Sequence, residues 1–163
     1  MALLKVSINS VKHDWREFCQ LTRQERWLLF QAIIFLPVIA AGLHFMNFQR
    51  LRAMLERFSP VPVGDNGDNA LQQAAATSRL VQAAAARMPF TIPCLVRSTA
   101  LWYLLRRQGI ASEIRIGVNR DKGEFHAHAW VETHGVVLND NPDIHHQYSP
   151  FEQIPLQNGV EKV

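Results

Sequence analysis

The sequence predicts an α+β fold in which one helix packs on a small antiparallel sheet, with an apolar helical extension ahead of them. Apolar residues recur at helical spacing after Cys94 until Gly109 ends the pattern. Apolar and polar residues then alternate, as they do in strands, over residues 111–118 and 124–132. Ahead of both patterns, residues 27–46 are apolar on all sides, which is typical of helices in a buried or membrane-facing position.

The length and composition fit a single domain of ordinary size with a buried core. The chain has 163 residues and average apolar content. A segment rich in Pro, Gly, Asn and Asp, residues 59–69, is a predicted linker between a helical region, residues 1–58, and a second part, residues 70–163. Lys and Arg outnumber Asp and Glu by eight to four before residue 59. No basic and aromatic pattern accompanies this excess, so no nucleic-acid partner is expected.

Two helices are expected in the extension. Residues Thr22–Glu25 fit a capping box that opens the first helix. The apolar stretch 27–46 is about as long as a membrane span, but Pro37 at its midpoint and two polar side chains interrupt it. We therefore expect a buried helical hairpin or an interfacial helix pair, with the second helix following Pro37 and ending near Phe58. Arg50, Arg52 and Arg57 lie next to this stretch, so a peripheral contact with a membrane surface is an alternative. A further helix is expected from Ala70 to Arg87, capped by Asn69.

Cys94 is the candidate nucleophile. Pro93 has a fixed φ and holds the preceding residues extended, so Cys94 is predicted to lie in the first turn of a helix. Unpaired N–H groups and the positive end of the helix dipole favour a thiolate there. The other cysteine, Cys19, is far away in the sequence, and two such residues make neither a disulfide framework nor a zinc site. A reducing, cytoplasmic compartment is therefore expected.

His128 and Asp140 are the candidate base and its orienting acid. The strand 124–132 places His128 on the same face as Trp130, which either shields the imidazole or fills the core. After a turn signal, the return strand 136–138 brings Asp140 back beside the middle of the preceding strand. The imidazole takes the thiol proton and the carboxylate fixes its tautomer, which is chemistry that requires no metal or other cofactor.

Several neighbouring residues have alternative roles. His126 shares a face with His128, and such a pair can bind a metal, although a third ligand is not evident. Asn139 and Asp143 compete with Asp140 for the orienting role. Arg97 lies one turn beyond the cysteine, where its charge can favour the thiolate or pair with a carboxylate to anchor a loop.

The motifs around these residues resemble the leader peptidases of lasso peptide biosynthesis, which belong to the transglutaminase-like cysteine protease superfamily. The resemblance covers about Ile92 to Asp140, and the joint occurrence of its blocks is more specific than any one of them. The blocks are Pro93–Ser98, Arg106–Gly109, Ile116–Val118, Phe125–Glu132, Gly135 and Leu138–Asp140.

The resemblance implies a papain-like or transglutaminase-like core with its catalytic residues at Cys94, His128 and Asp140. It also implies an activity, removal of the leader from a ribosomally made precursor peptide, after which a separate cyclase closes the core peptide. Residues 1–58 are helical and apolar in character and do not resemble a small β-rich recognition module, so we expect a separate leader-recognition protein. A non-catalytic peptide-binding scaffold and an acyl transferase are the alternatives, because one fold hosts several outcomes.

Overall fold

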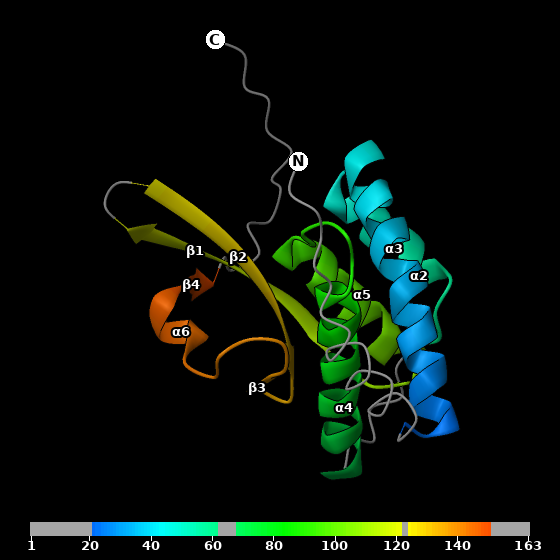
Figure 1. Cartoon of the computed structure of the whole chain (residues 1–163). Coiled ribbons are helices and arrows are strands. Elements are labelled where there is room, and N and C mark those ends of the chain that lie inside the picture. The colour runs from blue at the N-terminus through cyan, green and yellow to red at the C-terminus, as the bar shows by residue number, and fades with distance from the viewer. Residues whose placement is uncertain (1–20, 62–67, 122–123, 151–163) are drawn as a thin grey trace, which may run out of the picture.

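The computed structural model describes residues 21–61, 68–121 and 124–150, which form a layer of helices beside a small sheet (Figure 1). Cys19 and the segments 62–67 and 151–163 lie outside the described residues. The sheet has the strand order β3-β2-β1-β4, with antiparallel pairing throughout. The elements are α2 (Arg23–Phe45), α3 (Phe48–Arg57), α4 (Asp68–Ala86), α5 (Cys94–Arg107), β1 (Glu113–Asp121), β2 (Glu124–Thr133), β3 (Val136–Val137), α6 (Ile144–Gln147) and β4 (Ser149–Pro150). The predicted α+β class is confirmed.

The start of α2 is the predicted capping box. The Thr22 hydroxyl accepts a hydrogen bond from the Glu25 N–H at 3.2 Å, and the Glu25 carboxylate accepts one from the Thr22 N–H at 2.8 Å. The hydrogen bonds that the Glu25 carboxylate accepts from the backbone N–H and from the hydroxyl of Thr22 hold the pKa of Glu25 below its ordinary value. The cap therefore keeps its full strength at neutral pH and weakens as pH falls through that lowered pKa.

The prediction that a second helix follows Pro37 was wrong. Helix α2 continues through Pro37 to Phe45, and the chain breaks at Asn47, whose side chain accepts a hydrogen bond from the Arg50 N–H at 2.9 Å and so caps α3. Proline removes one backbone hydrogen bond, but burial of Leu36 and its neighbours against α4 and α5 outweighs that loss.

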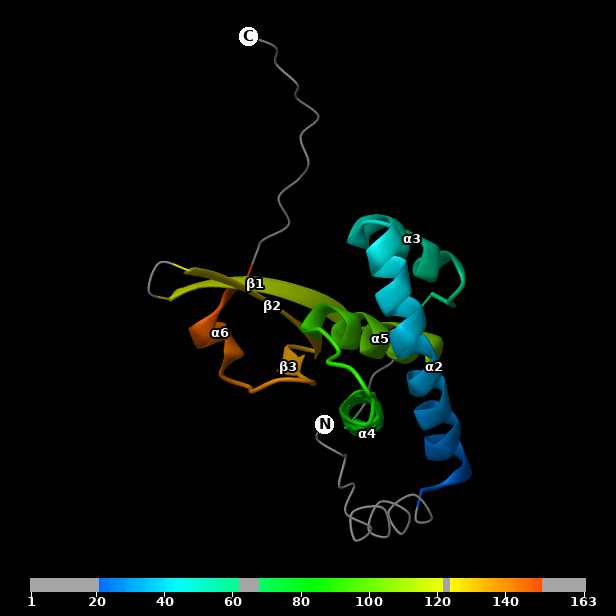
Figure 2. The same ribbon diagram turned by 45° about the horizontal axis from the view of Figure 1, so that its top comes forward.

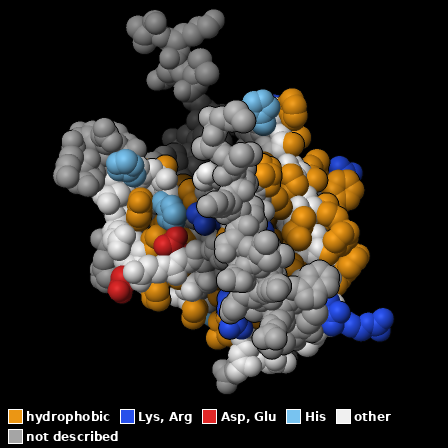
Figure 3. Space-filling view, viewed as in Figure 1, with side chains coloured by type: hydrophobic (Ala, Val, Ile, Leu, Met, Phe, Trp, Pro, Cys, Tyr) orange, Lys and Arg blue, Asp and Glu red, His pale blue; other side chains and the backbone are white. Residues whose placement is uncertain are grey.

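One face of α2 is buried and the opposite face is exposed. The exposed side chains include Trp27, Phe30, Ile34, Val38 and Phe45, and Figure 3 shows hydrophobic side chains gathered over α2 and α3. In the described ranges, α2 is the one helix long and apolar enough to cross a membrane, although core helices of soluble proteins also meet that criterion. The buried face shares one hydrophobic core with α4 and α5. The described helices on the two sides of the predicted linker therefore contribute side chains to one core.

The ends of the other elements follow local rules, with one difference from the prediction. Helix α4 begins at Asp68, so Asn69 lies inside the helix and does not cap it. Helix α5 ends as predicted, because Gly109 adopts φ +78° and the N–H of Ile110 donates to the Leu105 carbonyl at 3.0 Å. Figure 2 shows α5 next to the strands β1 and β2, which it contacts with one side.

A tight turn joins β2 to β3. His134 and Gly135 both have positive φ, 49° and 75°, as the two central residues of a type I′ hairpin turn do. The turn pairs Thr133 with Val136 and Glu132 with Val137. The chain therefore returns along β2 and delivers Asp140 to the middle of that strand.

Candidate active site

Cys94 is the first residue of α5. Pro93 precedes it with φ −60° and ψ 152°, and the first intrahelical hydrogen bond runs from the Arg97 N–H to the Pro93 carbonyl at 3.1 Å. The N–H groups of Cys94 and the two residues after it thus come before the first bond of the helix. The thiol is free and half-buried. A sulfur in this position lies where backbone dipoles favour negative charge.

His128 and Asp140 are in direct contact. The Nε2 of His128 lies 2.5 Å from the Oδ2 of Asp140, and both side chains are partly shielded from water. When the Nε2–H of His128 donates a hydrogen bond to the carboxylate, Nδ1 is left as an acceptor that can take a thiol proton. The second carboxylate oxygen accepts the N–H of Asn141 at 2.8 Å, which fixes the orientation of the acid.

Asn139 and Asp143 do not take the orienting position. The side-chain oxygen of Asn139 accepts the Val131 N–H at 2.7 Å, and its amide group donates to the Ser98 hydroxyl at 3.0 Å. Asp143 is exposed and precedes α6. Asp140 is therefore the acid beside His128, as expected from its place after the return strand.

Ser98 connects α5, which begins at Cys94, to the strand that carries His128 and to the segment that carries Asp140. Its hydroxyl is fully buried, donates to the Ala129 carbonyl at 2.8 Å and accepts from Asn139. Residues four apart on a helix lie on the same face with Cβ atoms about 5–6 Å apart, so Cys94 lies one turn from the strand position next to His128. The described part of the chain has no hydrogen bond between the thiol and the imidazole. The ring and the carboxylate are thus assembled, and the helix that begins at Cys94 is bonded to the residue after His128. Catalytic hydrogen bonds often form only when substrate binds.

Two aromatic rings lie against His128. Trp130 is fully buried and stacks at 6.4 Å between ring centroids, and Tyr148 lies at 5.3 Å with a tilt of 33°. Trp130 is thus buried against the imidazole and does not belong to the hydrophobic cluster that α2, α4 and α5 share among the described residues. A Cβ at Gly117 would come within 2.8 Å of the Trp130 ring, which explains a glycine inside β1. The role of Tyr148 was not predicted, because contact across 20 residues leaves no periodic signal.

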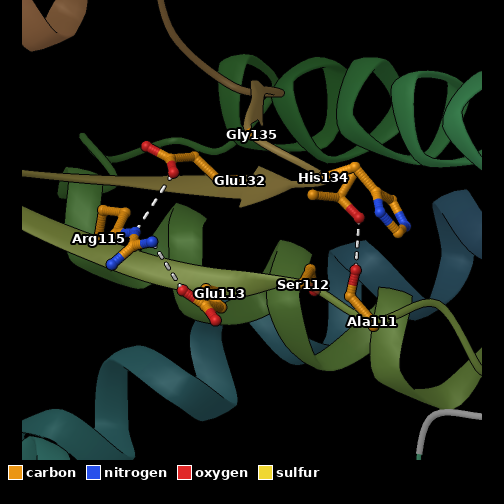
Figure 4. A pocket seen from close by; sticks show the side chains of 8 residues that line it. Ala111, Ser112, Glu113, Arg115, Glu132, His134 and Gly135 are labelled. Atoms are coloured by element: carbon orange, nitrogen blue, oxygen red, sulfur yellow. Dashed lines mark hydrogen bonds and ion pairs between the residues drawn. The ribbon is translucent and has the colours of Figure 1, made fainter. Parts of the chain in front are cut away.

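A buried carboxylate holds α6 against the sheet. Glu132 accepts hydrogen bonds from the Trp130 ring at 2.5 Å and from Arg115 at 3.2 Å, and it lies 3.1 Å from His145. Figure 4 shows Arg115 reaching both Glu132 and Glu113 beside a cavity of about 380 Å³. His145 links α6 to β2 through this carboxylate and so braces the segment that follows Asp140.

The remaining candidates lie around this centre. His126 is exposed. Arg97 is half-buried and contacts an amide, because its Nη1 lies 3.3 Å from the Gln82 Oε1; within the described ranges it pairs with no carboxylate. The described residues contain no group of three or more His, Cys, Asp or Glu side chains that could hold a metal ion.

Comparison with known proteins gives one match. The family model of the transglutaminase-like superfamily matches residues 38–153, which include Cys94, His128 and Asp140. No curated protein and no solved structure matches the chain.

Proposed function

The chain belongs to the transglutaminase-like superfamily, and we propose that it acts there as a cysteine peptidase that removes the leader from a ribosomally made lasso precursor peptide. The superfamily includes cysteine peptidases and acyltransferases, so family membership alone does not choose between them. The narrower assignment is supported by the resemblance of the motifs between Ile92 and Asp140 to lasso leader peptidases.

The contact between His128 and Asp140 is the observation that carries this proposal. An imidazole bonded to a carboxylate through Nε2 presents Nδ1 as a base. The hydrogen bond from Ser98 to Ala129, the residue after His128, supports a position of this base near the helix that begins at Cys94. A nucleophile, a base and an orienting acid from three separate elements are what acyl transfer from an amide requires.

The proposed reaction has two steps. His128 takes the Cys94 thiol proton, the sulfur attacks the carbonyl carbon of the last leader residue, and the proton passes to the departing amine of the core peptide. A thioester remains on the cysteine. Water then attacks this thioester, with His128 again taking a proton, and releases the leader as a carboxylic acid. The backbone N–H groups at the start of α5 supply donors for the oxyanion, including that of Cys94 itself.

Three partners follow from the proposal. They are the precursor peptide, a separate leader-recognition protein that delivers the leader, and a cyclase that receives the freed core. The site is proposed to work without a metal or other cofactor, and in the cytoplasm, where the precursor is made.

Product analysis tests the proposal. The chain is incubated, in water enriched in ¹⁸O, with a lasso precursor peptide and a leader-recognition protein. We expect one cleavage and a leader whose new carboxyl group carries one ¹⁸O atom, because water resolves the thioester. An amide formed with an added amine would establish the acyl-transferase alternative instead. Absence of any cleaved product, with iodoacetamide labelling Cys94 no faster than Cys19, would favour the non-catalytic scaffold.

We also propose that the exposed face of α2 contacts an anionic membrane surface. Its apolar stripe runs from Trp27 to Phe45, and arginines lie near both ends, with Arg23 at the start and Arg50 and Arg57 in α3. An amphipathic surface of this kind suits phospholipid headgroups with a negative charge.

Sedimentation with lipid vesicles measures this contact. The chain is expected to pellet with phosphatidylglycerol vesicles at low salt and to stay in solution with phosphatidylcholine vesicles, because the arginines are attracted only to the former. The double replacement Trp27→Ser and Val38→Ser should lower the pelleted fraction several-fold, whereas Gln49→Ser, also exposed, should not. An equal pelleted fraction with phosphatidylglycerol and phosphatidylcholine vesicles would refute an anionic-lipid contact.

A further inference from the structure

A cleft lies along the segment that leads into the candidate nucleophile. It has a volume of about 670 Å³ and is built by the last turns of α4, the segment before α5 and the first turn of α5. Its lining includes Thr91 and Ile92, which immediately precede Pro93 and Cys94, and Arg97, which follows Cys94 by one turn. When the carbonyl carbon of a bound peptide reaches the sulfur, the side chain of a neighbouring peptide residue can therefore enter this cleft.

The walls of the cleft combine apolar and polar surface, and among the described lining residues the charge comes from one side chain. Ala85, Ala86, Met88 and Phe90 form apolar wall, and Arg97 contributes the guanidinium. Within the described part of the chain, the Nε of Arg97 is shielded from solvent without a hydrogen-bond partner, and its Nη1 contacts a neutral amide at 3.3 Å and no carboxylate. A partly dehydrated cation with no anionic partner among the described residues is unusual, because such groups are normally paired.

The surrounding sequence supplies no carboxylate that could fill this role. Between Asp68 and Glu113 the chain contains no Asp or Glu, whereas it contains five arginines. Of these five arginines, Arg97 lines the cleft. A carboxylate that entered the cleft would be attracted by the Arg97 guanidinium.

We propose that this cleft is a substrate subsite that receives an Asp or Glu side chain of the peptide, with its carboxylate on the Arg97 guanidinium and its methylene groups against the apolar wall. The proposal rests on the proposed peptidase function and adds a specificity-determining residue to it. Arginine suits the role because its planar donors bind a carboxylate in a fixed orientation.

Alkylation of Cys94 by short peptidyl fluoromethyl ketones tests the subsite. The reagents carry Glu or Gln at the first, second or third residue from the reactive group, and the rate of labelling is measured by mass spectrometry on the full chain. At one of these positions we expect Glu to label about ten-fold faster than Gln, the discrimination that a charge-assisted hydrogen bond provides. The preference should disappear in Arg97→Met and persist in Arg87→Met, which removes an equal charge outside the cleft lining.

A second variant tests the subsite independently if Arg97→Met does not fold. Ala86→Glu leaves Arg97 in place and adds a carboxylate to the exposed end of α4 at the cleft wall, so it should also abolish the preference for Glu. Equal labelling by Glu and Gln reagents at all three positions, or a preference that survives both cleft variants, would overturn the subsite. Failure of every reagent to label Cys94 would instead count against the peptidase function itself.

Discussion

Alanine at Cys94 is expected to abolish leader release, and alanine at His128 to slow it by about 10³-fold, within the range that general acid–base groups contribute. Without the sulfur no thioester forms. Without the imidazole the thiol proton has no acceptor, and the departing amine has no proton donor. Because the two residues act as one unit, the double variant should be no slower than Cys94→Ala alone. The rate of leader release from the precursor, followed by mass spectrometry, checks each expectation.

Two further variants separate catalysis from general damage. His126→Ala removes a histidine from the same strand, two positions away and exposed, and should keep most of the activity. Asp140→Asn should reduce activity partially, since an amide can still orient the ring but stabilises the imidazolium less well than a carboxylate 2.5 Å away. Cleavage at the normal rate by Cys94→Ala would remove the basis of the proposed mechanism.

The parts of the fold that local rules determine were predictable from sequence. Proline before Cys94 and glycine at position 109 bound α5 at both ends, because each residue acts through its own φ angle. The alternation in residues 124–132 indicated β2, and the turn after it indicated where Asp140 returns. The contact of His128 with Asp140 follows from that hairpin geometry, so the pair could be expected without knowledge of the helices.

The parts that depend on packing between distant segments were not predictable. Pro37 predicts a break, but the buried face of α2 packs on α4 and α5, and tertiary contacts hold the helix together across the proline. His145 has an exposed, polar sequence context, yet it reaches the buried carboxylate of Glu132. A serine inside a helix is also an unremarkable sequence feature, and only the structure shows that Ser98 connects three elements.

The second large expected effect is that of replacing Ser98, whose hydrogen bonds connect α5 to β2 and to Asn139. Ser98→Ala is expected to lower the free energy of unfolding by about 1–3 kcal/mol, the cost of leaving buried polar partners unsatisfied, because the Ala129 carbonyl loses a donor and the Asn139 amide loses an acceptor. Urea unfolding followed by circular dichroism measures the change. Thr99→Val is the matched control, since it removes the next buried hydroxyl of α5. Within the described residues, that hydroxyl bonds the Leu95 carbonyl of the same helix at 2.7 Å and no other element.

Activity should distinguish these two variants more sharply than stability does. Ser98 fixes the strand that carries His128 and, through Asn139, the residue before Asp140, so its loss lets the base and its acid move relative to Cys94. A displacement of about 1 Å can cost about 10²-fold in rate, and we expect a loss of that order in kcat for Ser98→Ala while the variant is still fully folded. Thr99→Val changes no contact between elements and should keep kcat near the original value. Equal activities of the two variants would mean that Ser98 stabilises the fold without positioning the site.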